Sequence, residues 1–372
     1  MRATRAIIHL ENLEKNLEAV RKKIGPNPEI CFPLKAGAYG HGAVQMARFA
    51  LDAGVKWLAV ASADEGMELR QAGINAKILI LSQILPEEIS EITCADLIPI
   101  VSDAEIIKLL AAAAENSKPL EVHLKIDTGM GRLGCRPEEA AGLAALIAKN
   151  KKLKLGGLAT HLSAADSATA GDILYTRDQL ARFRCAAEDI RSKGIDPGIL
   201  HAANSGAVCF HEQSYFDMVR PGILLYGYPA GDSLPPDLEV LPVMELRSTI
   251  VLIKKIRAGE EISYGRTWKA AQDTCIGNLP IGYADGLPRG LSNNYSVKIR
   301  DKTYPLAGRI CMDQCMVNLG NGGEVKRWDE AVIFGPGFTG AGEIAQKTGT
   351  IHYEILCNIN KRVPRIYING EK

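Results

Sequence analysis

The residues from Ile30 to about Tyr228 alternate short apolar runs with longer helix-like segments. Helical periodicity is clearest in Asp103–Asn116, Pro137–Lys149 and Asp172–Lys193. The β-leaning runs between helical segments are Ile30–Lys35, Trp57–Ala61, Lys77–Ser82, Asp96–Val101, Glu121–Asp127, Gly156–His161, Ile199–Asn204 and Asp217–Arg220. Eight strands that alternate with helices predict a (β/α)8 barrel. A doubly wound open sheet is the alternative, but the first turn carries Lys35 and Tyr39 instead of a Gly-x-Gly-x-x-Gly motif.

The sequence changes character after Tyr228. Residues 229–237, PAGDSLPPD, are rich in Pro, Gly and Asp and predict a linker. Beyond it, β-branched runs alternate with turns at Ser248–Ile256, Thr274–Leu279, Tyr295–Arg300, Met316–Leu319 and Ala331–Phe334, and only Gly342–Thr348 looks helical. We therefore expect an α/β protein with a barrel over residues 1–230 and a mostly β domain over residues 240–372. The strand-like Ala6–His9 stands outside the eight-strand count and is available to pair with the β domain.

Length, charge and cysteine usage narrow the functional class. A chain of 372 residues suits two domains, and its net charge of +1 gives no field that attracts nucleic acid or an anionic membrane. The N-terminus lacks the apolar segment of a signal peptide, and no stretch reaches the length of a membrane span. Nine scattered cysteines, an odd number, indicate reduced thiols and a cytoplasmic protein. Cys311 and Cys315 lack the second pair that a metal site needs, so we expect buried thiols and no metal.

One lysine stands where chemistry is expected. Lys35 follows the first barrel strand within the glycine-rich string LKAGAYGHG, residues 34–42, and a helix-like segment runs from Ala43 to Leu51. A lysine amine can condense with an aldehyde to form a Schiff base, which no other side chain does well. The plainer alternative is a surface lysine whose stem covers apolar atoms while its head reaches water.

Polar residues follow several other predicted strands. They are the run Asp127–Arg132 after the fifth strand, His161 at the end of the sixth, Asn204 and Ser205 at the end of the seventh, and Arg220 at the end of the eighth. Taken singly, each has a plain explanation, such as a helix N-cap for Ser205 or a surface ion pair for Arg220. In a (β/α)8 barrel, however, the C-terminal strand ends share one rim, and phosphate groups bind after strands seven and eight. Free N–H groups at Gly222 and Ile223 would suit a phosphate there.

Eight short motifs follow one another along the chain. They are LKAGAYGHG, KIDTGMGRLG (125–134), ANSGA (203–207), VRPGILLYG (219–227), SYGRTW (263–268), GYADG (282–286), GRICMDQ (308–314) and HYEILC (352–357). In these motifs and their order the chain resembles the bacterial alanine racemases, which depend on pyridoxal 5'-phosphate (PLP), over nearly its whole length. One position departs, because Gly37 stands where the family has Asp or Asn, and we expect a looser turn with the reactive groups untouched. The resemblance implies a barrel followed by a β domain, and a head-to-tail homodimer in which the partner's β domain completes each active site.

The resemblance also implies how PLP would be bound. Lys35 would hold the cofactor covalently, and Arg220 would face its pyridine nitrogen, with His161 hydrogen-bonded to Arg220. Its phosphate would be held by Tyr39, Ser205, Gly222, Ile223 and Tyr353, with Asn204 in the same cofactor-binding set. A guanidinium has a pKa above about 12 and cannot give up its proton here, so the ring nitrogen would stay unprotonated. That favours return of the proton to the α-carbon over transamination, as racemisation requires.

For the substrate, the resemblance implies a two-base mechanism. Lys35 would move the α-proton on one face of alanine, and Tyr264 of the partner subunit would move it on the other face. The substrate-binding set would be Arg132 and the backbone of Met312 at the carboxylate, Asp313 beside them, and Tyr283 at the entrance. In some family members the lysine that matches Lys125 is carbamylated. The product D-alanine would serve peptidoglycan synthesis.

Three other functions stay open at this stage. A PLP-binding regulator related to the barrel would lack the C-terminal domain that carries Tyr264 and Met312, and a related decarboxylase would lack an arginine matching Arg220. A racemase that prefers serine, or one of broad specificity, is the hardest alternative to separate. Tyr353 is bulky where serine-directed relatives carry a smaller polar residue, which favours alanine.

Overall fold

The computed structural model describes residues 2–115 and 118–369. The chain divides into two compact units, which we call the barrel unit (residues 14–38 and 43–240) and the β unit (residues 2–13, 39–42 and 241–369). The short segment 39–42 thus belongs to the β unit, although it lies within the barrel part of the sequence.

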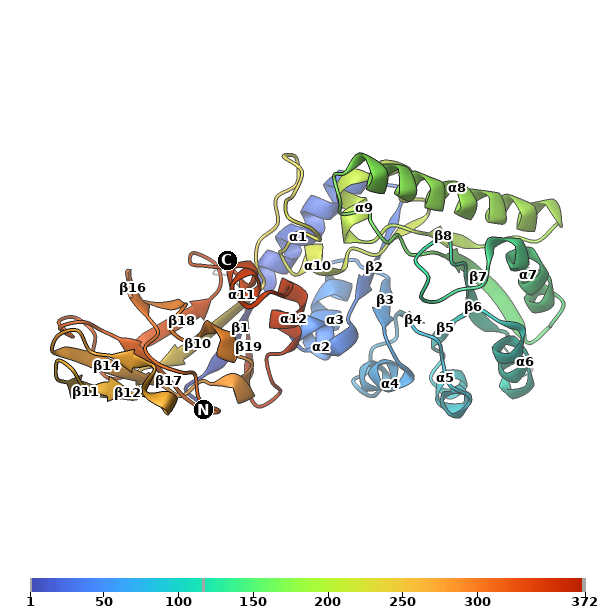
Figure 1. The fold of residues 1–372 in the computed structure, drawn as a ribbon. Coiled ribbons are helices and arrows are strands. Elements are labelled where there is room, and N and C mark those ends of the chain that lie inside the picture. The colour runs from blue at the N-terminus through green and yellow to red at the C-terminus, as the bar shows by residue number, and fades with distance from the viewer. Residues whose placement is uncertain (1, 116–117, 370–372) are drawn as a thin grey trace. The chain divides into compact units, whose positions relative to one another are not determined.

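The barrel unit contains the parallel sheet that the alternating pattern predicts (Figure 1). Its strands are β2 (Glu29–Pro33), β3 (Trp57–Val60), β4 (Lys77–Ile80), β5 (Ile98–Val101), β6 (Leu120–Lys125), β7 (Leu153–Ala159), β8 (Ile199–His201) and β9 (Met218–Val219). They are hydrogen-bonded in the order β8-β7-β6-β5-β4-β3-β2-β9. The gap between β8 and β9 is bridged just beyond the strands, where the Arg220 N–H donates to the Ala203 carbonyl at 2.9 Å. The barrel is therefore nearly closed, and the predicted fold class is confirmed.

Helices separate most of these strands along the chain. They are α1 (Leu10–Ile24), α2 (Lys35–Tyr39), α3 (Ala43–Asp52), α4 (Ala63–Gln71), α5 (Ile89–Cys94), α6 (Ala104–Ala113), α7 (Ala140–Ala148), α8 (Ala170–Ser192), α9 (Ser205–Phe210) and α10 (Gly222–Leu225). Polar side chains fix some helix starts, as where the Asp103 carboxylate accepts from the Ile106 N–H at 2.9 Å. That helix, α6, ends at Ala113 instead of the predicted Asn116, and residue 116 lies outside the described residues. None of the described helices is long and apolar enough to cross a membrane.

Mostly apolar side chains fill the inside of the barrel. One buried cluster consists of Cys31, Trp57, Ala59, Leu79, Ile98, Ile100, Ala159 and Met218. His123 and His201 are buried as well, and the His123 ring centre lies 5.6 Å from that of Trp57. Buried polar rings of this kind cost free energy unless they are hydrogen-bonded.

The β unit is built mainly from strands. They are β1 (Arg5–His9), β10 (Met244–Thr249), β11 (Leu252–Ile256), β12 (Glu261–Ile262), β13 (Trp268–Lys269), β14 (Thr274–Leu279), β15 (Ser296–Ile299), β16 (Lys302–Pro305), β17 (Cys315–Asn318), β18 (Glu330–Phe334) and β19 (Arg365–Ile368). The main sheet has the order β16-β15-β18-β10-β1-β19, and smaller sheets are β11-β14-β17 and β12-β13. Because β1 pairs antiparallel with β10 and parallel with β19, the N-terminal strand belongs to this sheet.

Two predictions for the β unit are wrong. The run Ser248–Ile256 is not one strand, because it is divided between β10 and β11, which belong to different sheets. Between them, the Ile250 N–H donates to the Asp329 carbonyl at 2.9 Å, which turns the chain from one sheet to the other. In addition to α11 (Ala341–Thr348), the unit contains an unpredicted helix, α12 (His352–Cys357). A six-residue helix is too short to display a hydrophobic period.

Candidate functional site

Lys35 opens a turn with an unusual backbone conformation. β2 ends at Pro33, and the four residues that follow Lys35, residues 36–39, all have φ between 51° and 61°. This left-handed helical conformation costs an L-residue about 1–2 kcal/mol. Such strain persists only where the surroundings impose it, and it gathers at functional sites. The backbone therefore singles out the same turn as the sequence motif.

Gly37 suits the conformation of this turn. Its φ of 61° and ψ of 44° lie in the left-handed region. Gly, Asn and Asp are the residues that adopt this region most readily, which explains why one can replace another here. The looser turn that we expect with glycine stays a prediction. The Glu65 carboxylate holds the turn in place, since it accepts from the Ala36 N–H at 2.6 Å and from the Ala61 N–H at 2.7 Å.

Arg220 lies at the same rim of the barrel as Lys35. It follows β9, which pairs in parallel with β2, so the two basic residues follow neighbouring strands. The buried guanidinium donates from Nη1 to Nδ1 of His201 at 2.8 Å, and from Nη2 to the carbonyls of Thr160 at 2.6 Å and Ala202 at 3.1 Å. Burial lowers the pKa of Arg220 to about 10, which leaves the group protonated at neutral pH.

The predicted histidine partner of Arg220 is wrong. Arg220 donates to His201 at the end of β8, and not to His161, which lies beyond β7. In the barrel β8 separates β7 from β9, so the histidine at the end of β8 stands nearer to the arginine that follows β9. The backbone carbonyl of His161 instead accepts from Nε2 of Gln179 at 3.1 Å.

Basic groups crowd around this rim. Burial, followed by the charges of Lys125, Arg220, Arg132 and Lys35, holds the pKa of His161 well below its usual range. Lys125 is itself buried at the end of β6, and burial, then Arg220 and Arg132, hold its pKa well below the usual range. Both His161 and Lys125 are thus driven toward their neutral forms. A rim with this surplus of cations favours anionic ligands.

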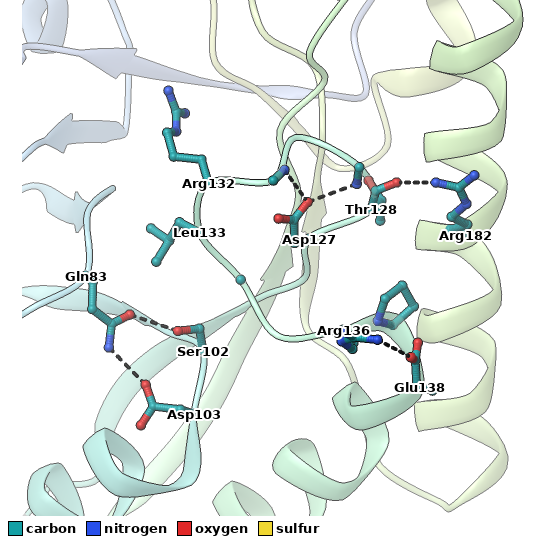
Figure 2. Close-up of a pocket in the computed structure, with 14 residues that line it drawn as sticks. Gln83, Ser102, Asp103, Asp127, Thr128, Arg132, Leu133, Arg136, Glu138 and Arg182 are labelled. Carbon is teal, nitrogen blue, oxygen red and sulfur yellow. Dashed lines mark hydrogen bonds and ion pairs between the residues drawn. The ribbon is translucent and has the colours of Figure 1, made fainter.

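The loop after β6 presents Arg132 (Figure 2). The Asp127 carboxylate closes the loop by accepting from two of its backbone N–H groups, at 2.9 and 3.1 Å. From α8, Arg182 donates to the Thr128 carbonyl at 2.8 Å. Arg132 is exposed and lines an open pocket of about 810 Å³ together with this loop. The loop is therefore fixed at its base while its arginine is left accessible.

Asn204 and Ser205 stand at the start of α9. The amide oxygen of Asn204 caps that helix by accepting from the Ala207 N–H at 3.0 Å, and its nitrogen donates to the Leu162 carbonyl at 2.9 Å. The Asn204 side chain is therefore engaged in positioning α9, and Ser205 with it.

The expected phosphate donors are only partly available. The Gly222 N–H donates to the Arg220 carbonyl at 3.0 Å, so the expectation that it is free is wrong. The Ile223 N–H has no protein acceptor within the described ranges. The Ser205 hydroxyl oxygen accepts from the Leu224 N–H at 3.4 Å, and this oxygen stands close to the start of α10. The Ile223 N–H and the Ser205 hydroxyl thus remain as the phosphate donors at this position.

In the β unit, Tyr39 and Tyr353 lie close together. Their ring centres are 6.0 Å apart, and burial, followed by the Tyr353 phenol, raises the pKa of Tyr39. The segment 39–42 packs tightly on α12, since a Cβ on Gly40 would lie 2.2 Å from the carbonyl oxygen of Leu356. Glycine is therefore required where this segment meets the helix that carries Tyr353.

Three other predicted site residues of the β unit are exposed. The exposed fraction is 70% for Tyr264, 53% for Met312 and 44% for Tyr283. The last two belong to loops that are bound to each other, because the Tyr283 N–H donates to the Cys311 carbonyl and the Ala284 N–H to that of Met312, both at 3.0 Å. Large apolar side chains left exposed together are typical of a contact surface.

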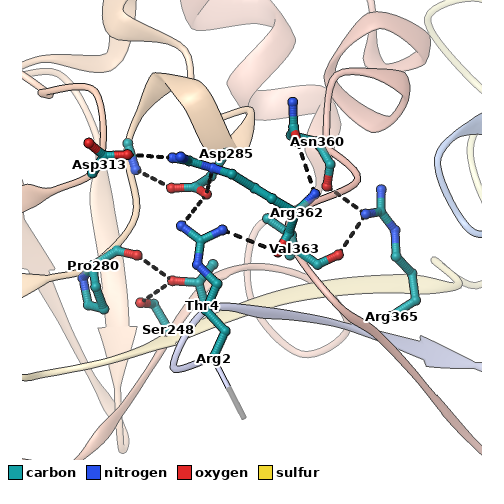
Figure 3. Close-up of polar contacts among 11 residues, drawn as sticks. Arg2, Thr4, Ser248, Pro280, Asp285, Asp313, Asn360, Arg362, Val363 and Arg365 are labelled. Carbon is teal, nitrogen blue, oxygen red and sulfur yellow. Dashed lines mark hydrogen bonds and ion pairs between the residues drawn. The ribbon is translucent and has the colours of Figure 1, made fainter.

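Asp313 belongs to an ion-pair network in the β unit (Figure 3). Arg362 donates from Nη2 to Asp313 at 2.8 Å and from Nε to Asp285 at 2.7 Å. The Asp285 side chain is fully buried, contacts Nη2 of Arg2 at 2.6 Å and accepts from the Gly282 N–H at 2.9 Å. Arg362 therefore connects the loop of Asp313 with the turn that carries Tyr283.

We expect Asp285→Ala to lower the free energy of unfolding by about 3 kcal/mol, because it leaves the partners of a buried carboxylate uncompensated. We expect a loss of free energy at the lower end of the range for broken buried ion pairs, because Arg2 and Arg362 are 30% and 38% exposed and can reach water. Urea unfolding monitored by circular dichroism measures it. Asp313→Ala is the matched control, because that carboxylate pairs with the same arginine but is 56% exposed. Equal unfolding midpoints for the two variants would contradict this account.

Sequence reasoning missed Glu65, His201 and Asp285. His201 lies inside the predicted strand Ile199–Asn204, close to its end, so the available signal was a second histidine near the rim. Asp285 stands inside the GYADG motif, where a carboxylate between two glycine turns is a sign of a structural cap. Glu65 gave no signal, because an acidic residue in the first turn of a helix is common.

Comparison with known proteins covers both units. The family model for the N-terminal domain of alanine racemase matches residues 8–230, and that for the C-terminal domain matches residues 243–367. An alanine racemase of Treponema denticola is 49% identical, over 99% of each chain, and one of Treponema pallidum is 45% identical, over 99% of this chain and 100% of that one. A solved alanine racemase of Clostridium difficile 630 has 36% identity and a TM-score of 0.94, covering 100% of this chain and 97% of that one.

Proposed function

We propose which residues of this chain carry out its reaction, because the chain belongs to the alanine racemase family and is an isomerase that interconverts L-alanine and D-alanine. The observation that carries the proposal is that Lys35 and Arg220 follow neighbouring strands at a rim crowded with cations. We infer that this rim binds PLP and that Lys35 is the point of covalent attachment. Membership of this family excludes two of the alternative functions, a PLP-binding regulator and a decarboxylase.

The residues present fit the chemistry of PLP. Arg220 uses three of its five N–H donors on His201, Thr160 and Ala202, which leaves donors for a ring nitrogen. The Ser205 hydroxyl, the Ile223 N–H and the surrounding cations suit a phosphate dianion. The proposed cofactor-binding set is Lys35, Tyr39, His161, Asn204, Ser205, Arg220, Gly222, Ile223 and Tyr353, with Asn204 and Gly222 acting through the turns that they hold.

When bound, PLP supplies an electron sink that makes the α-proton of an amino acid acidic. The Lys35 amine would take or return that proton on one face of the substrate. Arg220 would donate a hydrogen bond to the ring nitrogen without releasing its proton, since it stays cationic at neutral pH. Arg132 and the Met312 backbone would hold the substrate carboxylate, with Asp313 beside them and Tyr283 at the entrance.

We propose that Tyr264 of the partner subunit serves the second face of the substrate, in a homodimer with shared sites. Support comes from the exposure of Tyr264, Met312 and Tyr283 on a single chain. We further propose a cytoplasmic enzyme whose D-alanine serves peptidoglycan synthesis. The described cysteines form no disulfide with one another, which suits a reducing compartment.

Lys125 would be carbamylated in this enzyme. A buried amine held neutral by its surroundings is a nucleophile, and its nitrogen can bond to the carbon of CO2 with release of one proton. The carbamate would carry a negative charge where the lysine is repelled by Arg132 and Arg220. It would therefore be attracted to both arginines and would orient Arg132 toward the substrate carboxylate.

We expect protein equilibrated with 13C-bicarbonate to show a carbamate carbon signal in its NMR spectrum, and Lys125→Met to lack it. The signal should be present near neutral pH and should fade as the pH falls through the lowered pKa of Lys125, because only the neutral amine reacts. Lys154→Met, which removes an exposed lysine, serves as the control. A spectrum of the wild-type protein without this signal would exclude the modification.

Borohydride reduction tests the cofactor proposal directly. Protein purified with PLP should absorb in the near ultraviolet or visible range, and reduction should fix the cofactor mass on the tryptic peptide that contains Lys35. Lys56→Met, which changes an exposed lysine, should be labelled normally, whereas Lys35→Ala should not be labelled. Covalent label on any other lysine would overturn the assignment.

A further inference from the structure

A line of buried polar groups runs through the inside of the barrel from Arg220. Nη1 of Arg220 lies 2.8 Å from Nδ1 of His201, and Nε2 of His201 lies 2.8 Å from Nδ1 of His123. All three side chains are buried. His123 stands in the middle of β6, between Glu121 near its start and Lys125 at its end. Since residues two apart on a strand share a face, these three residues of β6 point the same way.

The hydrogen bonds fix which nitrogen of each histidine carries the proton. Arg220 can only donate, so Nδ1 of His201 must accept. Burial, followed by the Arg220 charge, holds the pKa of His201 well below its usual range, so its ring is neutral with the proton on Nε2. That proton is donated to Nδ1 of His123, whose own proton then lies on Nε2. This second Nε2 has no hydrogen-bond partner among the described residues, and Glu121 Oε1 lies 3.7 Å away.

Glu121 closes the line at the opposite end of the barrel. Its carboxylate is 3.1 Å from Nζ of Lys77 and 3.9 Å from that of Lys154, at the N-terminal ends of β4 and β7. The neighbouring His123, more than any other group, lowers the pKa of Glu121 to about 2. The line thus begins at a cation at the rim and ends at a carboxylate, with two neutral rings between them.

The backbone of β7 makes room for this line. The pairing of β6 with β7 shifts register between Val122 and His123, which marks a bulge. A Cβ on Gly156 would lie 2.4 Å from Cγ of Glu121, and a Cβ on Gly157 would lie 2.8 Å from the His123 ring. Two consecutive glycines therefore leave space for these two polar side chains, at the positions where a strand of ordinary residues would exclude them.

We propose that Glu121 is a positioning residue for racemisation, because its carboxylate, 3.7 Å from Nε2 of His123, supports the tautomers that Arg220 requires and so helps to keep Nδ1 of His201 as the acceptor that orients Arg220. This inference rests on the proposed role of Arg220. Without the Glu121 carboxylate, only the Arg220 end of the line would still favour the proton on Nε2 of His123. Wherever the reversed tautomers formed, the N–H of His201 would face the N–H of Arg220, and the arginine would lose this hydrogen bond and its fixed orientation.

The competing explanation is that Glu121 only anchors Lys77 at the surface of the barrel. The two explanations differ in what they predict for the tautomers. If Glu121 only forms an ion pair, its replacement affects stability and leaves the tautomers of the histidines unchanged. If Glu121 is a positioning residue, its replacement changes the tautomer of His201. The test therefore needs a signal from His201 besides the rate of the enzyme.

The first measurement uses protein labelled with 15N-histidine and free of cofactor. Protonated and unprotonated ring nitrogens differ widely in chemical shift, and the His201→Asn and His123→Asn variants assign the signals of the two rings. In the wild-type protein both rings should be Nε2–H tautomers. In Glu121→Leu, the signals of His201 should show a mixture of tautomers. Glu121→Gln keeps an acceptor oxygen without the charge and should largely restore the wild-type pattern.

The second measurement is steady-state racemisation of alanine. We expect kcat to fall about tenfold in Glu121→Leu and about threefold in Glu121→Gln with KM nearly unchanged, because the interaction matters most during the reaction. Glu29→Gln is the matched control. Glu29 stands at the start of β2 and pairs with Lys56 at 2.7 Å, and it has no histidine partner among the described residues. This control should keep both the tautomers and kcat of the wild type.

Each outcome decides something. Unchanged His201 tautomers in Glu121→Leu, with kcat within twofold of the Glu29→Gln control, would overturn the proposal even if stability fell. Should Glu121→Leu fail to fold, Glu121→Gln decides by itself, and a kcat equal to that of the Glu29→Gln control would overturn the proposal. If Arg220→Lys racemised alanine at the wild-type rate, the role of Arg220 would fail instead, while the tautomer result would still report on the line of histidines.

Discussion

Arg220→Glu should reduce kcat for alanine racemisation on the order of a thousandfold and raise the share of turnovers that end in transamination. The arginine stays protonated at neutral pH, so it cannot supply a proton acceptor to the cofactor ring. A carboxylate in its place would hold a proton on the ring nitrogen and draw charge away from the α-carbon. Reprotonation at that carbon would then lose its advantage. Pyruvate formation, followed beside racemisation in one assay, measures the change.

Arg220→Lys is the control for this prediction. It keeps a cation at the position but cannot make the forked set of hydrogen bonds to His201, Thr160 and Ala202. We therefore expect a loss of rate without a gain in transamination. Circular dichroism of both variants shows whether the barrel is intact. An Arg220→Glu enzyme that is folded and racemises at the wild-type rate would mean that the arginine has no electronic role.

The barrel could be predicted from sequence because each strand is short, apolar and separated from the next by a helical period. Such patterns depend on neighbouring residues and need no knowledge of distant contacts. The left-handed turn after Lys35 could not be predicted in this way. Ala36 and Ala38 favour right-handed helix, and contacts made by Glu65 from another part of the chain help to hold the turn.

The histidine partner of Arg220 shows the same limit at the site. His161 ends one predicted strand and His201 lies near the end of the next, and the strand pattern offers no reason to prefer either. What decides between them is the spatial order of β7, β8 and β9, which places the end of β8 beside Arg220. The prediction thus placed a histidine at the correct rim, but which strand presents it depends on how the barrel closes.

The β unit was harder to predict from the sequence, because its strands pair with strands that are distant along the chain. β1 pairs with β10 and β19, partners more than 230 residues away, which no local pattern reveals. The division of the predicted strand at Ile250 depends on a hydrogen bond to Asp329. Similarly, the network of Asp285, Arg2 and Arg362 joins three distant segments.

Mixing two inactive variants should restore activity if Tyr264 reaches its site from the partner subunit. Lys35→Ala and Tyr264→Ala should each lose nearly all racemase activity, because each removes one of the two proposed proton carriers. The Tyr264 side chain is 70% exposed in the single chain, so it is accessible to a partner subunit. In a heterodimer of the two variants, one shared site would lack both groups and the other would keep both.

The restored level can be calculated. Random exchange makes half of the dimers mixed, and each of these has one intact site out of two, so activity should reach roughly a quarter of the wild-type level. Fluorescent labels on the two variants report the exchange itself. A third variant, Lys56→Met, mixed with either inactive protein, checks that exchange does not harm an active chain, since Lys56 is exposed and pairs with Glu29 at the surface. If both proton carriers came from one chain, every site would keep one defect, and a mixture that exchanges subunits would stay inactive.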